Sequence, residues 1–308
     1  MSTGSAASTL AGNRVVSGVR RFLGTQEGIL LLLLVGLFAI VGAMNPRFLA
    51  ERNVTDLFNA NAFIAVAAIG MTMVIVTGNI DISVGAAIGV LATLSGNVTL
   101  VLEDSGLPVI LINVIAWTAP ILGGMAIGAF NGFFVAFLGI PAIVVTLGTF
   151  SILKGGLILL WGGQTIDRLP DGYTFAQDDW LGFPSPIWIM FILTAVAFVW
   201  MRYSRTGRSQ YAVGGNAEAA RLSGLDSRRV LMTTFILAGS MTGVASVLFA
   251  TQFNVIQAVA TPALELQIIT ASVVGGVSIL GGVGTVLGST LAAILIRSIG
   301  SAMVFIDV

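Results

Sequence analysis

Residues 204–229 read SRTGRSQYAVGGNAEAARLSGLDSRR and form the longest polar interruption in an otherwise apolar sequence. The stretch is basic, with five arginines against Glu218 and Asp226. Lysine and arginine near the ends of membrane spans resist transfer across the bilayer, so we expect this stretch on the cytoplasmic side. The apolar runs before and after it are then expected to cross the membrane.

A short helix outside the membrane is predicted at the centre of this stretch. Asn216 is a typical N-cap residue, and Glu218 places a negative charge in the first turn. Arg221 places a positive charge in the last turn, and Gly224 is a typical stop signal. Because so short a helix has little stability of its own in water, we expect it to be held against the bundle or a partner.

The composition of the 308 residues is that of an integral membrane protein. Hydrophobic residues make up 56% of the chain, charged residues make up 9%, and the mean hydropathy is +1.00. The chain has no cysteine and no histidine, which excludes disulfides, thiol nucleophiles and imidazole ligands for a metal. Its formal net charge is zero, so no footprint for nucleic acid is present.

Nine apolar runs are long enough to be membrane spans, since about 20 residues cross ~30 Å of hydrocarbon. The runs cover residues 28–44, 60–78, 82–102, 109–138, 141–163, 187–203, 230–250, 265–281 and 283–306. The predicted fold is all-α, a polytopic transmembrane helical bundle with broken helices. Residues 1–27 are expected to form a cytoplasmic tail and residues 28–308 the membrane domain. A cleaved signal peptide is the alternative for the tail, but the first run is too long for one and no clear cleavage site follows it.

The order of the runs predicts which loops share a side of the membrane. With a cytoplasmic N-terminus, residues 164–186 lie outside and residues 204–229 lie inside. The outer loop is acidic, as expected, whereas Arg47 and Arg52 after the first span contradict the charge rule. Nine spans leave the C-terminus outside, directly after an apolar run, so we expect a tenth span in a longer chain or in relatives.

The clearest helix break is predicted at residues 77–83, TGNIDIS, which separate two apolar runs without a loop long enough to leave the membrane. Gly78 is expected to end one helix, and Asp81 with Ser83 to cap the next. Direct contact with a substrate is the alternative role for Asp81. Non-helical backbone at membrane depth must be buried in protein or line a water-filled cavity, so this break is expected to face the bundle interior.

Four further features interrupt the apolar runs or lie near their ends. Pro141 is expected to begin the fifth span. Lys154, later in that span, is expected either to face a pore or to pair with a carbonyl or carboxylate. The run GGVSILGGVG, residues 275–284, predicts a close turn between two spans, and Glu265 is expected near the outer end of its span.

Four ordered motifs together resemble the permease subunits of bacterial ABC importers for monosaccharides, the group of ribose, xylose, arabinose, rhamnose and autoinducer-2 permeases. These motifs are GMTMVIVTGNIDISVG (70–85), IPAIVVTLGT (140–149), GRSQYAVGGNAEAARLSGL (207–225) and ELQIITASVVGGVSILGGVGTVLGS (265–289). The resemblance covers about residues 28–306. It implies ten spans, of which this sequence holds nine.

The resemblance implies a dimeric membrane core made of two identical or two similar permeases, located in the bacterial inner membrane. Two ATPase subunits that bind ATP and Mg²⁺ are implied on the cytoplasmic face, and a periplasmic protein is implied to deliver the sugar. No cofactor is expected in this chain, which lacks the GxxxxGK[ST] phosphate loop. The short helix then corresponds to a coupling helix that docks into the ATPase. Its contact residues are expected to be Asn216, Glu218, Ala219, Arg221, Leu222 and Gly224.

A neutral sugar needs no buried countercharge, and the scarcity of ionisable groups within the spans fits such a cargo. The residues expected to line the path are Asn79, Asp81, Ser83, Asn131 and Gln267. One alternative is a secondary transporter, and another is an ABC permease for branched-chain amino acids or nucleosides. A membrane-embedded enzyme would need a carboxylate pair, which the predicted topology opposes by placing Asp81 and Glu265 on opposite sides.

Overall fold

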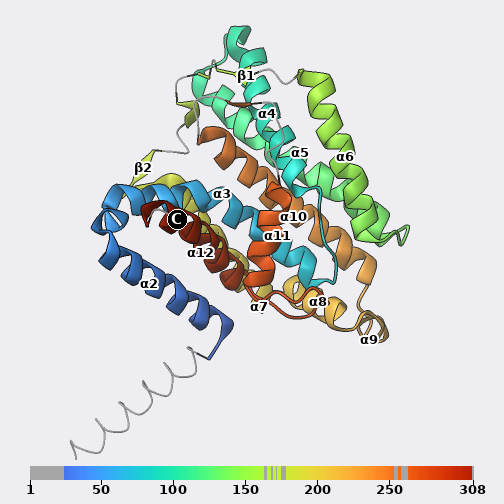
Figure 1. Ribbon diagram of the computed structural model, residues 1–308. Helices are drawn as coiled ribbons and strands as arrows, with labels where there is room; N and C mark the ends of the chain where they lie inside the picture. Colours follow the sequence, from blue (N-terminus) through green and yellow to red (C-terminus); the bar gives the residue numbers. More distant parts are fainter. Residues whose placement is uncertain are drawn as a thin grey trace, which may run out of the picture.

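The computed structural model describes residues 24–162, 165–167, 169–170, 172–174, 178–252, 256–257 and 263–306. Most of the predicted N-terminal tail, residues 1–23, lies outside this set. Within it the chain forms a helical bundle (Figure 1), and the predicted fold class is confirmed. Eight of the described helices are long and apolar enough to cross a membrane. They are α2 (Gln26–Met44), α3 (Glu51–Val76), α4 (Val84–Leu102), α5 (Val109–Ala136), α6 (Ala142–Trp161), α7 (Ser185–Tyr203), α10 (Ser227–Thr251) and α12 (Val286–Phe305).

Shorter elements connect these spans. The helical ones are η1 (Pro46–Leu49), η2 (Glu103–Ser105), α8 (Arg205–Gly215), α9 (Ala217–Leu222) and α11 (Leu264–Val274). Two small antiparallel pairs complete the described elements: β1 (Thr165–Ile166) pairs with β4 (Ile256–Gln257), and β2 (Asp179–Trp180) pairs with β3 (Phe183–Pro184). Thr165 lies opposite Gln257, so the first pair ties the segment after α6 to the segment after α10.

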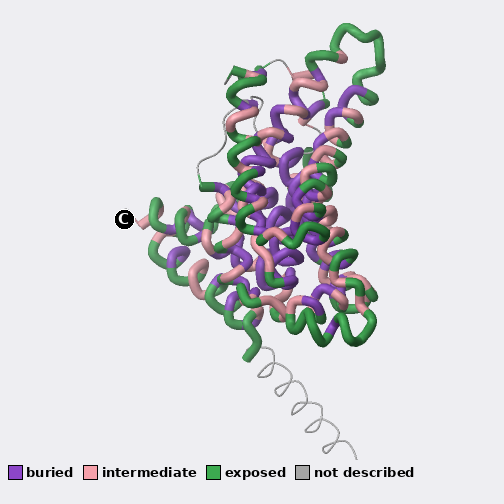
Figure 2. The backbone as a smooth tube through the Cα atoms, turned by 90° about the vertical axis from the view of Figure 1, so that its right-hand side faces the viewer, coloured by how far each residue is buried: buried purple, intermediate pink, exposed green. Residues whose placement is uncertain are grey.

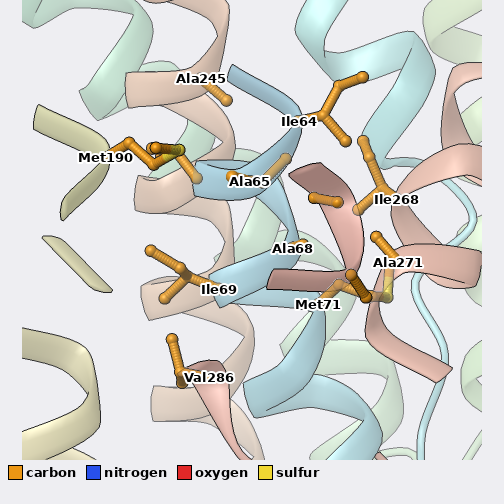
Figure 3. Packing of buried hydrophobic residues seen from close by; sticks show 14 of the residues in the cluster. Ile64, Ala65, Ala68, Ile69, Met71, Met190, Ala245, Ile268, Ala271 and Val286 are labelled. Carbon is orange, nitrogen blue, oxygen red and sulfur yellow. The ribbon is translucent and has the colours of Figure 1, made fainter. Parts of the chain in front are cut away.

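Helix α3 is the centre of the bundle. Its residues from Asn61 to Val76 are buried without a break, because the sequence there is apolar on every side of the helix. Figure 3 shows Ile64, Ile69 and Met71 of α3 among side chains from four other helices. Those side chains are Met190 of α7, Ala245 of α10, Ile268 and Ala271 of α11, and Val286 of α12. Figure 2 shows the resulting concentration of buried residues in the middle of the molecule.

Helices α5 and α10 pack backbone against backbone at glycine residues. A Cβ atom added at Gly124 would overlap the carbonyl oxygen of Gly239, and one added at Gly128 would overlap that of Phe235. Small residues permit this approach in a membrane, where helices associate through close packing rather than through exclusion of water. The pair therefore forms a rigid wall beside α3 and α4.

The connections gather at two ends of the bundle. Residues 77–83, 137–141, 204–226 and 275–285 lie at the end that carries α9, which we call the α9 end. The opposite end carries η1, η2 and the β1–β4 pair, and we call it the β1 end. In Figure 1, α9 lies at the bottom and β1 at the top. The two loops that the sequence assigns to opposite sides, around β1 and around α9, therefore lie at opposite ends of the bundle.

The eighth predicted span, residues 265–281, does not form one membrane-length helix. Its helix is α11, which has 11 residues and is about 16 Å long, roughly half of the ~30 Å hydrocarbon thickness. The chain after it stays non-helical up to residue 285, and Gly276, Gly281 and Gly282 all have positive φ angles there. These conformations are available to glycine and end a helix, so the apolar run is divided into a half-length helix and a turn.

Candidate translocation path and coupling site

The break at residues 77–83 forms because Gly78 stops α3. Gly78 has a φ of 79°, and the Thr77 hydroxyl donates to the Val74 carbonyl at 2.7 Å, so α3 ends where the sequence predicts. Asn79 donates from its side chain to Thr77, at 3.1 Å to both oxygens. The residues that follow lie against α5 and α6 before α4 begins at Val84.

Four buried polar side chains form a chain of hydrogen bonds at the start of α4. Asp81 accepts bonds from the backbone N–H and the hydroxyl of Ser83, at 2.8 and 2.6 Å. The Asn131 amide donates to the Ser83 hydroxyl at 3.0 Å and accepts from the Thr149 hydroxyl at 2.6 Å. Three of the predicted path residues therefore come together, and they join the break to α5 and α6.

The predicted capping of α4 is wrong in its details. Ser83 is the residue before the helix, but its side chain makes no capping bond to the first turn of α4. Asp81 instead bonds the N–H of Ser83 itself, because the carboxylate lies two residues before it and closes a local turn. The group therefore fixes the shape of the break rather than the end of the helix.

Two threonines of α6 hold the break from the other side, and the sequence analysis missed them. Thr146 accepts from the Ile82 N–H at 3.1 Å, and Thr149 completes the chain to Asn131. Both lie in the IPAIVVTLGT motif, three residues apart and so on one face of a helix. That spacing, with a helix break elsewhere in the sequence, was the signal that could have identified them.

Glu265 and Gln267 lie on the half-length helix α11, and their positions differ from the prediction. The Glu265 carboxylate lies against Gly85 in the first turn of α4, so a Cβ at Gly85 would overlap it. The prediction that Glu265 and Asp81 lie on opposite sides is therefore wrong, because α11 starts deep inside the bundle. Gln267 is exposed on the same helix and is not part of the hydrogen-bond chain around Asn131.

A polar hollow of about 410 Å³ opens between α4 and α6 near the β1 end. Its lining includes Thr93 and Asn97 of α4, Trp161 and Gly162 at the end of α6, and Thr165 of β1. Asn131 of α5 and Thr149 of α6 lie at the other end of α4, near Ser83, so uncharged polar groups border α4 near both of its ends. Thr93 and Asn97 are not among the path residues predicted from the sequence.

Lys154 lies exposed on α6, with its ammonium nitrogen 5.4 Å from the centroid of the Phe150 ring. A cation over an aromatic face is stabilised by the ring's quadrupole. A Cβ atom added at any of the glycines 148, 155 and 156 would meet nothing within 4 Å, so the face of α6 around Lys154 is open.

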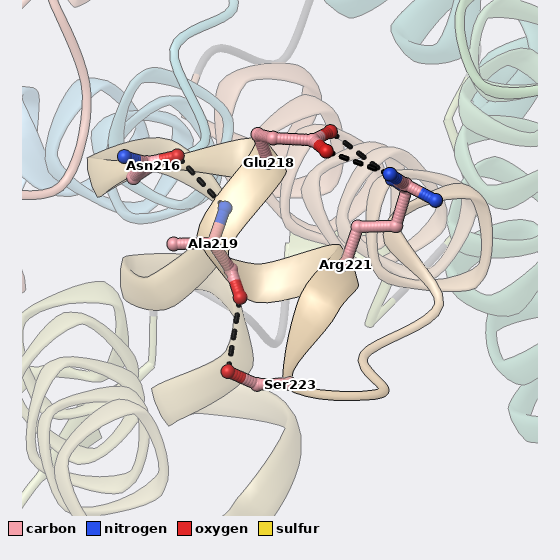
Figure 4. Close-up of polar contacts among 5 residues, drawn as sticks. All are labelled: Asn216, Glu218, Ala219, Arg221 and Ser223. Carbon is pink, nitrogen blue, oxygen red and sulfur yellow. Dashed lines mark hydrogen bonds and ion pairs between the residues drawn. The ribbon is translucent and has the colours of Figure 1, made fainter.

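The helix predicted from Asn216 is confirmed as α9 (Figure 4). The Asn216 side chain accepts from the Ala219 N–H at 2.9 Å, and Gly224 has a φ of 83°. Arg221 donates to both oxygens of Glu218, at 3.0 and 2.6 Å. This contact lowers the pKa of the Glu218 carboxyl and raises the pKa of Arg221, because the charged forms stabilise each other.

One side of α9 is packed against the bundle and the other is exposed. Ala220 is buried with Val213 of α8 and Val230 of α10. All six predicted coupling residues are exposed, and Leu222 shows 75% of its surface. Helix α8, which the sequence pattern did not predict, directly precedes α9. The Ser204 hydroxyl caps α8 by accepting from the Gly207 N–H at 2.8 Å.

Among the described residues, no three acidic side chains lie close enough together to form a metal site. The chemistry of the buried polar groups at the helix break is hydrogen bonding within a helical bundle. Together with broken helices and a braced helix outside the spans, it defines the protein as a membrane permease component.

Comparison with known proteins agrees with this class. The family described as "Branched-chain amino acid transport system / permease component" matches residues 53–307. The chain belongs to this permease family, and the predicted resemblance to permease subunits of ABC importers is confirmed. A permease of this kind is a transport component and a multi-pass membrane protein.

Two curated proteins are similar in sequence to most of this chain. The autoinducer 2 import system permease protein LsrC of Salmonella typhi is 36% identical over 286 residues, which cover 92% of this chain and 80% of the relative. The LsrC protein of Yersinia enterocolitica serotype O:8 is 35% identical over 282 residues, covering 91% of this chain and 76% of the relative. No solved structure is significantly similar to the chain.

Proposed function

We propose that the chain forms half of the translocation path of an ATP-driven importer for a small, neutral, sugar-like molecule. An autoinducer-2-like cargo is the first to test, since the similar proteins belong to autoinducer 2 import systems. The path runs beside α4, from the hollow at Asn97 toward Asn131 and Thr149. Amides and hydroxyls can bind the hydroxyl groups of such a cargo and release it again, and neither side requires a buried charge.

The observation that carries this proposal is the exposed face of α9. Glu218, Arg221 and Leu222 form a preorganised polar and apolar patch on a helix that is braced from behind by Ala220. Such a patch suits a groove on an ATPase subunit, which would bind ATP and Mg²⁺ and supply the energy. The α9 end is then the cytoplasmic end.

The complete importer would contain a second permease, either another copy of this chain or a similar one, and two ATPase subunits. A periplasmic binding protein would dock at the β1 end and deliver the cargo. The N-terminus would lie in the cytoplasm, on the same side as α9.

Co-purification in mild detergent tests the α9 assignment. The tagged chain is co-expressed with the ATPase encoded beside it, and the native sequence is compared with a Glu218→Ala, Arg221→Ala double variant. The native chain should retain the ATPase, and the double variant should co-purify about tenfold less of it. A charged pair at an interface contributes both to the affinity and to the orientation of the two partners.

A matched control is the Arg52→Ala, Asp56→Ala double variant, which removes an exposed ion pair of 3.8 Å at the β1 end. It should retain the ATPase as the native chain does. Retention that is equal in all three proteins would assign the docking surface elsewhere, and no retention by the native chain would contradict an ATP-driven importer.

The family description favours branched-chain amino acids as a second candidate cargo. Binding-protein-dependent uptake of radiolabelled leucine, ribose, rhamnose and autoinducer-2 into reconstituted vesicles separates the candidates. We expect uptake of autoinducer-2 or a sugar, because a zwitterionic amino acid needs charged partners that the lining of the α4–α6 hollow does not supply. Uptake of leucine alone would reverse this assignment.

A further inference from the structure

Three segments far apart in the sequence meet at one backbone carbonyl. The Val76 carbonyl at the end of α3 accepts from the Gly282 N–H at 2.8 Å. Gly214 of α8 packs on the same carbonyl, so a Cβ there would overlap it and lie 2.9 Å from the Gly282 nitrogen. A Cβ at Gly281 would lie 2.7 Å from the Gly214 oxygen and 2.9 Å from the Gly78 nitrogen. We call Val76, Gly78, Gly214, Gly281 and Gly282 the glycine junction.

A second contact ties α8 to the same loop. Tyr211, one turn before Gly214, donates from its hydroxyl to the Gly284 carbonyl at 2.9 Å. Partial burial raises the pKa of the Tyr211 hydroxyl, and the nearby Glu27 carboxylate adds to that rise, so the group remains a donor. Helix α8 therefore holds the loop between α11 and α12 at two points.

Helix α8 is joined to α9 without a flexible linker. Asn216 alone lies between them, and its N–H donates to the Ala212 carbonyl at 3.1 Å while its side chain caps α9. Ala220 packs on Val213, which is the residue before Gly214. A displacement of α9 therefore also displaces the end of α8, because no flexible linker lies between the two helices.

Both segments that meet α8 lead to the start of α4. The break after Val76 runs through Gly78 to Asp81 and Ser83, where the hydrogen-bond chain to Asn131 begins. The loop containing Gly281 and Gly282 follows α11, whose Glu265 lies against Gly85. Two routes from α8 thus converge on the first turn of α4, one through the break and one through α11.

We infer that Gly214 is the positioning residue through which movement of α9 reaches α4 and α11 during transport. The inference rests on the proposed function. Backbone atoms in direct contact have no rotatable side chain between them, so a shift of α8 moves both partner segments, as expected of a packed element with two arrangements. A methyl group at Gly214 separates these backbones and weakens the transmission without altering the exposed face of α9.

The test compares Gly214→Ala with Gly215→Ala in the reconstituted complex with the ATPase and the binding protein. At Gly215 a Cβ would meet Gly282 Cα at 3.9 Å, an ordinary contact, so the neighbour is a matched control. Gly214→Ala should keep ATPase binding and basal ATP hydrolysis but lower cargo transported per ATP about tenfold, within the range of residues that couple two sites. Gly215→Ala should match the native complex in all three measurements.

The distance between two spin labels provides a second measurement, whose predicted result does not follow from a loss of stability. The chain has no cysteine, so spin labels can be placed through cysteines introduced at Leu280 and Leu138, which are exposed on two loops of the α9 end. The Leu280–Leu138 distance should change on ATP binding in the native and Gly215→Ala complexes and stay constant in Gly214→Ala. A native coupling ratio and a native distance change in Gly214→Ala would overturn the inference.

Tyr211→Phe is the second test of the inference, to be used if the Gly214→Ala protein does not accumulate in the membrane. This variant removes the bond to Gly284 without adding an atom to the junction, and it should lower transport per ATP while ATPase binding stays intact. Unchanged coupling in Tyr211→Phe would then count against the inference. Absence of ATPase binding by the native chain is a different result, because it contradicts the proposed function itself.

Discussion

Asn131 is the residue on which the shape of the helix break depends. Its amide donates to Ser83 and its carbonyl oxygen accepts from Thr149, so one side chain joins three segments. Asn131→Leu should leave two buried hydroxyls without this partner and lower the free energy of unfolding by about 1–2 kcal/mol. The midpoint of thermal unfolding in detergent measures this loss, and uptake should fall with it.

Thr118→Val on the same helix is the control for Asn131→Leu. The Thr118 side chain is exposed and donates to the Val114 carbonyl of its own helix, so its removal should leave the midpoint unchanged. Equal midpoints for the two variants would show that the bonds of Asn131 add nothing to stability.

Tyr173 fixes the segment after α6 onto the bundle at the β1 end. It is fully buried, and its hydroxyl lies 2.7 Å from that of Ser95, which donates to the Ala116 carbonyl. Burial raises the pKa of Tyr173 from its usual 10.0 to about 12, with the Ser95 bond opposing the rise. Stability from neutral Tyr173 is therefore fully present below about pH 10 and is lost as the pH rises toward 12.

Titration of tyrosine absorbance tests this pKa. The titration of native protein should include the ionisation of Tyr173 near pH 12, and Tyr173→Phe should lack this contribution. The variant should also lose less stability than native protein between pH 10 and 12, measured as the shift of the thermal midpoint. The same high-pH titration in both proteins would contradict the assignment.

At the scale of elements, local signals predicted some boundaries and missed others. Asn216 and Gly224 marked α9 because caps act within one turn, and Gly78 marked the end of α3 for the same reason. Helix α8 was missed because its residues are polar and mixed, and its stability comes from packing at Gly207, Gln210 and Val213. The hydropathy pattern also predicted a helix longer than α11, one that continued through the glycines at which α11 ends. An apolar turn and an apolar span have similar compositions, so hydropathy does not distinguish them.

The candidate path could be predicted only in part, because its residues come from several segments that meet only in the folded structure. Asp81, Ser83 and Asn131 were identifiable as polar residues in apolar surroundings. Thr146 and Thr149 share one face of α6, but hydroxyl groups are common in spans, so their spacing became informative only once α6 was placed against the break. The depth at which α11 begins, and with it the place of Glu265, follows from tertiary packing with α3, α4 and α12.

At the scale of the whole molecule, the distribution of charge predicts which end faces the cytoplasm. The α9 end carries Arg202, Arg205, Arg208, Arg221, Arg228 and Arg229. The described part of the β1 end has Arg47 and Arg52, and acidic residues accompany them. Arg52 forms an exposed ion pair with Asp56, and Glu51 lies beside it, so the positive charge that contradicts the rule is partly compensated. Since arginines near span ends resist translocation, the α9 end should be cytoplasmic.

Two exposed serines offer a matched pair for testing this orientation in a chain without cysteine. Ser223 follows α9 and donates to the Ala219 carbonyl, while Ser105 ends η2 at the β1 end and donates to the Leu102 carbonyl. Ser105→Cys should react with a membrane-impermeant maleimide in intact spheroplasts, and Ser223→Cys should react only after the membrane is opened. The reverse result would place α9 outside the cytoplasm, where an ATPase subunit could not bind it. It would therefore contradict the proposed contact between α9 and the ATPase, and with it the assignment as an importer.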